Sequence, residues 1–331
     1  MGASNILFQE YREQEAIEND FQEENINIQY SEEQQKRQEL IDKLRNREVK
    51  LSYSWLKEFQ KSPLHFLNYK LKQREPQTES MIFGSICDLL ITEPDRFNDK
   101  FKTVSSLPST DNQKGFVSDI LNGLSKEDAF KNNYSRGSLD NTYESLKDYI
   151  ECLQEKKTPV TAEIYNSAKK LTDSLLQNES INVLINSCSD FQEKIEWKYK
   201  GWDFIGFKDC SSPGLIVDLK HSKDANPEAF ERDVYRMDYF LQMGLYSSSE
   251  IETPDCFFLV YEKSGHFSIL KIDYSFLAYG LRKVDFLLAK LEDCIQNDRW
   301  NESYNFFDDR SYKTIYKPKW AKGFELDIED E

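Results

Sequence analysis

The segment Leu-Ile-Val-Asp-Leu-Lys-His at residues 215–221 constrains the fold of this chain more than any other. Its apolar run has the length of a strand, and such a run is typical of a strand buried on both faces. A Ser-Ser-Pro-Gly turn precedes it, and helical spacing begins at Asn226-Pro227, a suitable N-cap and first-turn pair. We therefore expect an α/β fold in which helices cover a central sheet.

Two hairpins accompany this strand. Residues 193–210 alternate polar and apolar side chains around Lys200-Gly201, and residues 256–273 do so around Ser264-Gly265. The rest of the chain shows mainly helical spacing. We expect helices in residues 51–72 (interrupted at Ser62-Pro63), 80–97 (ending near Glu93-Pro94), much of 105–190, 226–249 and 275–300.

The charge is distributed unevenly along the 331 residues. The net charge is −16, of which residues 1–48 contribute −6 and residues 323–331 contribute −5. We therefore expect an acidic, Gln/Glu-rich arm at 1–48, one domain at 49–322 and an acidic tail at 323–331. Two interpretations of the arm stay open: a mobile segment that turns helical near its end, or a solvated helix packed on the domain edge.

Composition excludes several classes of protein. The sequence has no apolar run of eighteen residues and begins without the features of a secretory signal, so we expect a cytoplasmic protein with no membrane span. Six cysteines form no Cys-x-x-Cys pair, which argues against a zinc ribbon. With only three histidines, a metal would be held by carboxylates, which favours Mg²⁺ or Mn²⁺.

The strongest candidate site combines Asp209, Asp218 and Lys220. The two aspartates are nine positions apart, at the end of one expected strand and within the next. Two carboxylates at close range favour a cation between them, and a hard divalent metal suits oxygen ligands. Alternation places Lys220 on the same strand face as Asp218, where its ammonium can act on a phosphate or a water. The alternative is an ordinary Asp–Lys ion pair at a strand end.

The order of these residues resembles a known nuclease core. Gly206 to Asp209, a turn, the strand with Asp218 and Lys220, and then Gln242 and Tyr246 on one helix face are similar to PD-(D/E)XK nucleases of the RecE-like and RecB-like branch. The resemblance implies a central mixed sheet flanked by helices, with helical insertions. It also implies that Gln242 and Tyr246 lie beside the active site. Without it, a helix that buries Tyr246 and exposes Gln242 would be the simpler interpretation.

Two positions depart from the family pattern. Counting from Gly84, the position of the family's histidine falls on Asp88, which the resemblance makes a metal ligand with Asp209 and Asp218. The alternative for Asp88 is a helix cap. His221 stands where threonine is usual, and we expect it to affect packing.

Other acidic residues near this region compete for the same roles. Asp203 competes with Asp209 for the position of the first strand aspartate, but the spacing favours Asp209. Glu193 and Glu196, on the preceding strand, are expected on the hairpin surface, although one of them could lie beside the site.

The resemblance implies a Mg²⁺- or Mn²⁺-dependent 5′–3′ exonuclease acting on double-stranded DNA ends in phage recombination or DNA processing. In this reading Lys220 positions the water for in-line attack on the phosphodiester. Related enzymes form rings and act with a single-strand annealing protein, and the location would be the host cytoplasm. Two alternatives remain: a non-catalytic DNA-binding or phage structural protein that retains the nuclease fold, and a site-specific endonuclease.

Overall fold

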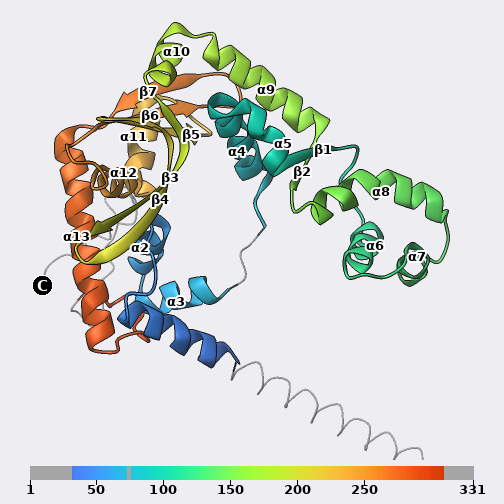
Figure 1. The fold of residues 1–331 in the computed structure, drawn as a ribbon, viewed down its shortest axis with the longest axis horizontal. Coiled ribbons are helices and arrows are strands. Elements are labelled where there is room, and N and C mark those ends of the chain that lie inside the picture. Colours follow the sequence, from blue (N-terminus) through green and yellow to red (C-terminus); the bar gives the residue numbers. More distant parts are fainter. Residues whose placement is uncertain (1–31, 73–75, 309–331) are drawn as a thin grey trace, which may run out of the picture. The chain divides into compact units, whose positions relative to one another are not determined.

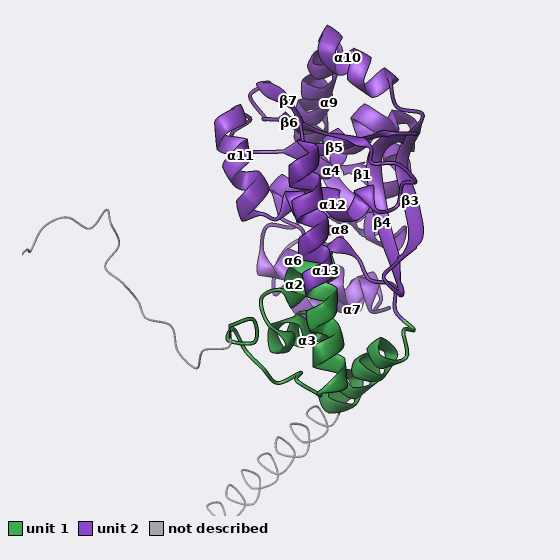
Figure 2. Ribbon diagram, turned by 90° about the vertical axis from the view of Figure 1, so that its left-hand side faces the viewer, with its two compact units in different colours: residues 1–48, 54–73, 287–331 green, residues 49–53, 74–286 purple. Residues whose placement is uncertain are grey.

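The computed structural model describes residues 32–72 and 76–308, which belong to two compact units (Figures 1 and 2). Unit 1 comprises Met1–Glu48, Ser54–Gln73 and Leu287–Glu331, and unit 2 comprises Val49–Tyr53 and Arg74–Phe286. The expected tail at 323–331 and the first 31 residues of the expected arm lie outside the described residues.

Unit 1 is helical. Residues 32–45 form a helix, and Ile41 and Leu44 on this helix are buried. This part of the arm is therefore helical, as both interpretations expect. The expected break at Ser62-Pro63 is present, because the Ser62 side chain accepts a hydrogen bond from the backbone N–H of His65 at the start of the next helix. The helices with residues in this unit are α2 (Tyr53–Phe59), α3 (Pro63–Leu71) and the end of α13 (Tyr274–Gln296).

Unit 2 is built on a five-stranded sheet in the order β3-β4-β5-β6-β7. The strands are β3 (Asp190–Tyr199), β4 (Trp202–Ser212), β5 (Leu215–His221), β6 (Asp255–Tyr261) and β7 (Phe267–Lys271). β5 and β6 pair in parallel and the other neighbours pair antiparallel, so the sheet is mixed, as expected. The predicted strand at 215–221 is therefore the central one.

Both predicted hairpin turns are present. Lys200 and Gly201 connect β3 to β4 with φ angles of 49° and 79°, and Gly265 lies between β6 and β7 with a φ of 94°. Positive φ at both turn residues matches the right-handed twist of paired strands. These turns fix the register of β3 against β4 and of β6 against β7.

Helices cover both faces of this sheet (Figure 1). α4 and α9 lie against the face that carries Val217 and Leu219, and α11 and α12 lie against the other face, where Phe230 and Tyr239 contact Phe258. The helices of this unit are α4 (Glu79–Thr92), η1 (Pro94–Arg96), α5 (Phe97–Lys100), α6 (Asp111–Leu121), α7 (Lys126–Asn133), α8 (Leu139–Gln154), α9 (Ala162–Leu176), α10 (Glu179–Asn186), α11 (Pro227–Arg236), α12 (Tyr239–Ser247) and the beginning of α13.

The helical insertion expected from residues 105–190 contains its own small core. Phe116, Leu146 and Ile150 are buried there, in helices α6 and α8. A second, two-stranded sheet pairs β1 (Phe101–Val104) with β2 (Thr158–Thr161) in parallel and joins the insertion to the rest of the unit. Among the described residues, no helix is long and apolar enough to cross a membrane.

The single helix predicted for residues 226–249 is wrong, because the chain forms two helices there. α11 begins as predicted at Pro227 with Asn226 as its cap, but it ends at Arg236. Asp238 then adopts a left-handed conformation with a φ of 60°, and it forms an ion pair with Lys283. Because aspartate tolerates this conformation when a partner holds it, the chain changes direction here and α12 starts on a new axis.

Two glycines allow α12 to cross the beginning of α13 closely. A Cβ on Gly280 would collide with the carbonyl oxygen of Phe240, and a Cβ on Gly244 would lie 2.7 Å from the backbone nitrogen of Leu281. Because a backbone carbonyl cannot move as a side chain can, we expect Gly280→Ala to destabilise the protein by about 1–3 kcal/mol. Chemical denaturation would measure this loss. Arg282→Ala, an exposed change on the same helix, should leave stability within about 0.5 kcal/mol; an equal loss in both variants would contradict the prediction.

Candidate active site

Asp209 and Asp218 lie where β4 and β5 separate. The last paired residues of these strands are Cys210 and Val217, and the two aspartates occupy the next position on each strand. Beyond this point the edge of β4 pairs instead with Leu51. The carboxylates therefore lie at the opening between two strands of the central sheet.

A distortion of β4 determines where Asp209 lies. Gly206 and Cys210 would share a face in a regular strand, but Gly206 contacts Tyr246 of α12 while Cys210 lies in the core formed with α4 on the opposite face. Facing this distortion, Gln192 on β3 has a φ of 47° and donates a hydrogen bond of 3.3 Å to Oδ1 of Asp209. The other oxygen of Asp209 accepts a hydrogen bond from a backbone N–H of β5.

Asp218 is buried and is held from two sides. Gln242 of α12 donates a hydrogen bond of 3.0 Å to Oδ1 of Asp218, and Lys220 forms an ion pair with Oδ2. Oδ2 is buried and accepts no hydrogen bond of regular geometry from the described residues. Lys220 also lies over the ring of Tyr239, 4.8 Å from its centroid. The predicted Asp–Lys pair is thus on one strand face, as alternation required.

Gln242 and Tyr246 both face the sheet. Gln242 is only 9% exposed, so the alternative in which it faces solvent does not hold. Tyr246 is buried above Gly206, where a Cβ would lie 2.8 Å from the tyrosine ring, and its hydroxyl lies 3.5 Å from the backbone N–H of Phe207. The helix face predicted from the spacing therefore lies against the strands that carry the aspartates.

Asp88 approaches from α4 on the other side of the sheet. It lies in the middle of the helix, whose cap is Thr78, so the cap alternative for Asp88 does not hold. The hydroxyl of Tyr261, on β6, donates a hydrogen bond of 2.6 Å to Oδ1 of Asp88. The structure thus brings together all the residues predicted for the site, from α4, β4, β5 and α12; their catalytic and metal-binding roles remain predictions.

The three carboxylates share one electrostatic environment. Burial raises the pKa of Asp88, and the charge of Asp209 raises it further. Burial also raises the pKa of Asp209, and here Asp218 adds to the effect. Burial opposes the charge of Lys220, but Asp218 and Asp209 outweigh it and hold the lysine pKa above its ordinary value. Lys220 therefore stays protonated at neutral pH.

This donor set fits a divalent cation. Three ionised carboxylates and one ammonium carry a net charge of −2, which one divalent cation would neutralise. The ligands are oxygens, which suit Mg²⁺ or Mn²⁺, and among the described residues the buried Oδ2 of Asp218 has only Lys220 as a partner. Within the described residues, no three acidic, His or Cys side chains are arranged as a formed metal site. In the structure both oxygens of Asp209 and of Asp218 are held by protein groups, so binding would require these two side chains to reorient, whereas Asp88 is bonded through Oδ1 alone.

The competing acidic residues lie elsewhere. Asp203 forms an ion pair with Lys198 on the hairpin, and Glu196 pairs with Lys194. Glu193 accepts a hydrogen bond from Ser211. All three belong to the hairpin of β3 and β4, and none of these bonds joins them to a residue of the site. The spacing between the two aspartates therefore selected Asp209, the residue that lies opposite Asp218 where the strands separate.

Sequence reasoning missed three residues of the site: Gln192, Tyr239 and Tyr261. Gln192 contacts Asp209 only because its backbone is left-handed, and glutamine carries no signal for that conformation. Tyr261 is the last residue of an apolar strand, and a tyrosine at such a position indicates core packing and not a site residue. Tyr239 gave no signal either, because the break at Asp238 that places it was not predicted.

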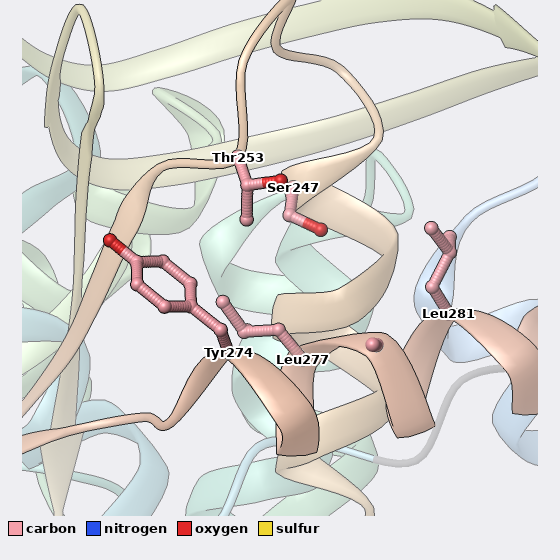
Figure 3. A pocket seen from close by; sticks show the side chains of 6 residues that line it. Ser247, Thr253, Tyr274, Leu277 and Leu281 are labelled. Atoms are coloured by element: carbon pink, nitrogen blue, oxygen red, sulfur yellow. The ribbon is translucent and has the colours of Figure 1, made fainter.

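A surface pocket is lined by none of these residues (Figure 3). Its wall is formed by the end of α12, the loop before β6 and the beginning of α13. The residues that line it are Ser247, Thr253, Tyr274, Leu277, Ala278 and Leu281. It contains no carboxylate and none of the predicted site residues, so the carboxylate cluster remains the candidate site.

The mixed sheet, with two aspartates and a lysine where its strands separate, defines a domain of the PD-(D/E)XK type. The chain belongs to the family described as a PDDEXK-like domain of unknown function (DUF3799), which matches residues 52–305. Among solved structures, it is similar to a protein from Eubacterium rectale titled a "putative exonuclease", with 14% identity, a TM-score of 0.49, and coverage of 81% of this chain and 91% of that one. This likeness is too distant to bear on activity. No curated protein matches the chain.

The raised pKa of Asp88 leads to a prediction about stability. Charge repulsion alone would suggest Asp218→Asn as the stabilising change, but Asp218 holds Lys220. Asp88 is bonded instead to the neutral Tyr261. The pKa of Asp88 is higher in the folded protein than in the unfolded protein. The ionisation of Asp88 therefore lowers the stability of the folded protein as the pH rises through this higher pKa. We expect Asp88→Asn to raise the melting temperature of the metal-free protein by about 2–5 °C at pH 8, and the gain to vanish near pH 4.

Differential scanning calorimetry in EDTA would measure this gain. Asp255→Asn is the matched control, because Lys271 lowers the pKa of Asp255 and its ionised form is the favoured one. That variant should not gain stability at pH 8. A gain for Asp88→Asn that is equally large at pH 4 would contradict the electrostatic explanation.

Proposed function

We propose that this protein is a Mg²⁺- or Mn²⁺-dependent deoxyribonuclease that hydrolyses phosphodiester bonds. The observation that carries the proposal is the convergence of Asp88, Asp209, Asp218 and Lys220 where β4 and β5 separate. An ordinary ion pair would need one carboxylate for Lys220. The two further carboxylates, with raised pKa values for Asp88 and Asp209, cost stability unless a cation binds there.

Each residue has a distinct part in this proposal. Asp88, Asp209 and Asp218 would hold the cation, and Gln242 orients the Asp218 carboxylate through its hydrogen bond. A bound divalent cation supplies Lewis acidity and neutralises charge on the phosphate. Lys220 is protonated and therefore cannot act as a general base. Its ammonium would instead stabilise negative charge on the phosphate and orient the attacking water.

We further propose that the substrate is the end of double-stranded DNA and that digestion runs 5′ to 3′, in phage recombination or DNA processing. A ring-shaped homo-oligomer and a single-strand annealing protein as partner belong to the same proposal. These points rest on the resemblance in sequence order. The net charge of −16 is no obstacle in itself, because residues 1–48 and 323–331 carry −11 of it.

Digestion of end-labelled linear duplex DNA, with circular duplex as the control, tests this function. With Mg²⁺ or Mn²⁺ we expect nucleotide release from linear DNA, none from circular DNA, and none in EDTA. Cleavage of circular DNA as fast as linear DNA would support the proposed nuclease activity but contradict the proposal that the enzyme is an exonuclease. If neither substrate is cut with either metal, the enzyme proposal fails and the non-catalytic DNA-binding or structural alternative takes its place.

A further inference from the structure

Tyr261 is a buried polar residue that the proposed reaction does not yet use. It is the last residue of β6 and has no exposed surface. Its hydroxyl lies 2.6 Å from Oδ1 of Asp88 and 3.5 Å from the carbonyl oxygen of Gly84, one helical turn earlier on α4. A buried tyrosine hydroxyl usually has a hydrogen-bond partner, so the hydrogen bond to Asp88 helps to stabilise Tyr261 in its buried position.

The hydroxyl has one proton to donate. A hydrogen bond to an ionised acceptor is shorter and about twice as strong as one between neutral groups. The shorter distance to Asp88 agrees with this preference, and the carbonyl of Gly84 is the weaker acceptor. The proton therefore lies toward Oδ1 of Asp88, while Oδ2 accepts no hydrogen bond from the described residues. One oxygen of the carboxylate is fixed and the other is left for a ligand.

The neighbouring strand supports the same stretch of α4. His221 on β5 is the partner of Tyr261 in the parallel ladder, and the two rings lie 5.7 Å apart. A Cβ on Gly84 would lie 3.2 Å from the Cβ of His221, and the ring of Phe83 lies 5.0 Å from the histidine ring. β5 and β6 thus hold two successive turns of α4, at Gly84 and at Asp88.

The two departures from the family pattern meet at this point. Asp88 replaces the usual histidine on the helix, and His221 replaces the usual threonine after the strand lysine. Tyr261 contacts both of them. An imidazole has a rigid ring that packing alone can orient, whereas a shorter carboxylate rotates freely unless a hydrogen bond fixes its plane. Tyr261 supplies that hydrogen bond.

We infer that Tyr261 is a positioning residue for Asp88 and that its hydroxyl holds the carboxylate in the orientation that binds the divalent cation. The inference rests on the proposed function, because it assigns Asp88 to the metal. Groups that orient a metal ligand commonly change metal affinity 10- to 100-fold when removed. The effect on this site is expected at the lower end of that range, because Asp88 keeps its charge and its place on α4.

Calorimetric titration of MnCl₂ into the full chain at pH 8 tests this assignment. The variants are Tyr261→Phe, Asp88→Asn and the double variant. We expect Tyr261→Phe to weaken Mn²⁺ binding about tenfold. In the Asp88→Asn background the same change should add no further loss, because there is no longer a carboxylate to orient. Equal losses in both backgrounds would show a purely structural role and overturn the inference.

Tyr199→Phe is the matched control for losing a hydroxyl. Tyr199 also donates to an aspartate, Asp285, at 2.8 Å, but this pair makes no contact with the three carboxylates. The Mn²⁺ affinity of Tyr199→Phe should equal that of the wild type. Thermal unfolding in EDTA would show that Tyr261→Phe is folded, and phenylalanine fills nearly the same volume.

The outcomes separate this inference from the proposed function. If Asp88→Asn leaves Mn²⁺ binding unchanged, Asp88 is not a ligand, and both its assignment to the metal and the inference about Tyr261 fail. If Asp88→Asn weakens binding but Tyr261→Phe does not, the metal site stands and only the role of Tyr261 is overturned.

Discussion

Replacing Lys220 with alanine is expected to lower metal-dependent cleavage of linear duplex DNA roughly a thousandfold, the usual effect of removing one group that stabilises transition-state charge. The ammonium is held beside Asp218 and over the ring of Tyr239, and it stays protonated because Asp218 and Asp209 raise its pKa. Mn²⁺ binding should be retained, because the variant leaves the carboxylates in place and removes the competing positive charge. Single-turnover cleavage would measure the chemical step.

The matched control is Lys271→Ala. Lys271 lies on β7 and also pairs with an aspartate, Asp255, but it is remote from the three carboxylates in the sheet order. We expect its cleavage rate to stay within about twofold of the wild type, in line with the small worth of exposed ion pairs. If Lys220→Ala cleaves DNA as fast as the wild type, Lys220 is an ordinary ion-pair partner and the proposed role is wrong.

Asp218→Asn is expected to weaken Mn²⁺ binding at least a hundredfold and to abolish cleavage. Asparagine keeps the shape and can still accept the hydrogen bond from Gln242, but it removes the buried charge that a hard cation requires. It also leaves Lys220 with less compensation for its burial. We therefore expect the metal-free variant to be less stable than the wild type, and not more stable as repulsion between aspartates alone would suggest.

Calorimetric titration and thermal unfolding would measure these two effects together. Asp203→Asn is a suitable control, because Asp203 pairs with Lys198 on the hairpin and competed with Asp209 in the sequence. It should bind Mn²⁺ as the wild type does. Unchanged affinity in Asp218→Asn would remove Asp218 from the metal site.

The sheet could be predicted from the sequence because local signals agreed with it. Lys200-Gly201 and Ser264-Gly265 marked both hairpins, and the apolar run around Asp218 marked the central strand. The break between α11 and α12 could not be predicted from nearby residues. Asp238 adopts a left-handed backbone conformation there and forms an ion pair with Lys283, which lies 45 residues away in the sequence. Such a tertiary partner leaves no local signal.

The candidate site was predicted where chemistry and spacing coincide. Asp209, Asp218 and Lys220 stood out because two carboxylates at close range favour a cation between them and because the order and spacing of these residues resemble the PD-(D/E)XK core. Gln192 and Tyr261 could not be found in this way. Gln192 contacts Asp209 because its backbone adopts a conformation that glutamine rarely takes, and Tyr261 reaches Asp88 across a distance of 173 residues in the sequence.

The central claim is that the three aspartates form a site for a divalent cation. An anomalous difference map at the manganese absorption edge, from crystals grown with MnCl₂, tests it most directly. We expect a peak within coordination distance of carboxylate oxygens of Asp209 and Asp218, and we expect it to be absent from Asp218→Asn crystals. A map without a peak at these residues, at a Mn²⁺ concentration that supports DNA cleavage, would contradict it.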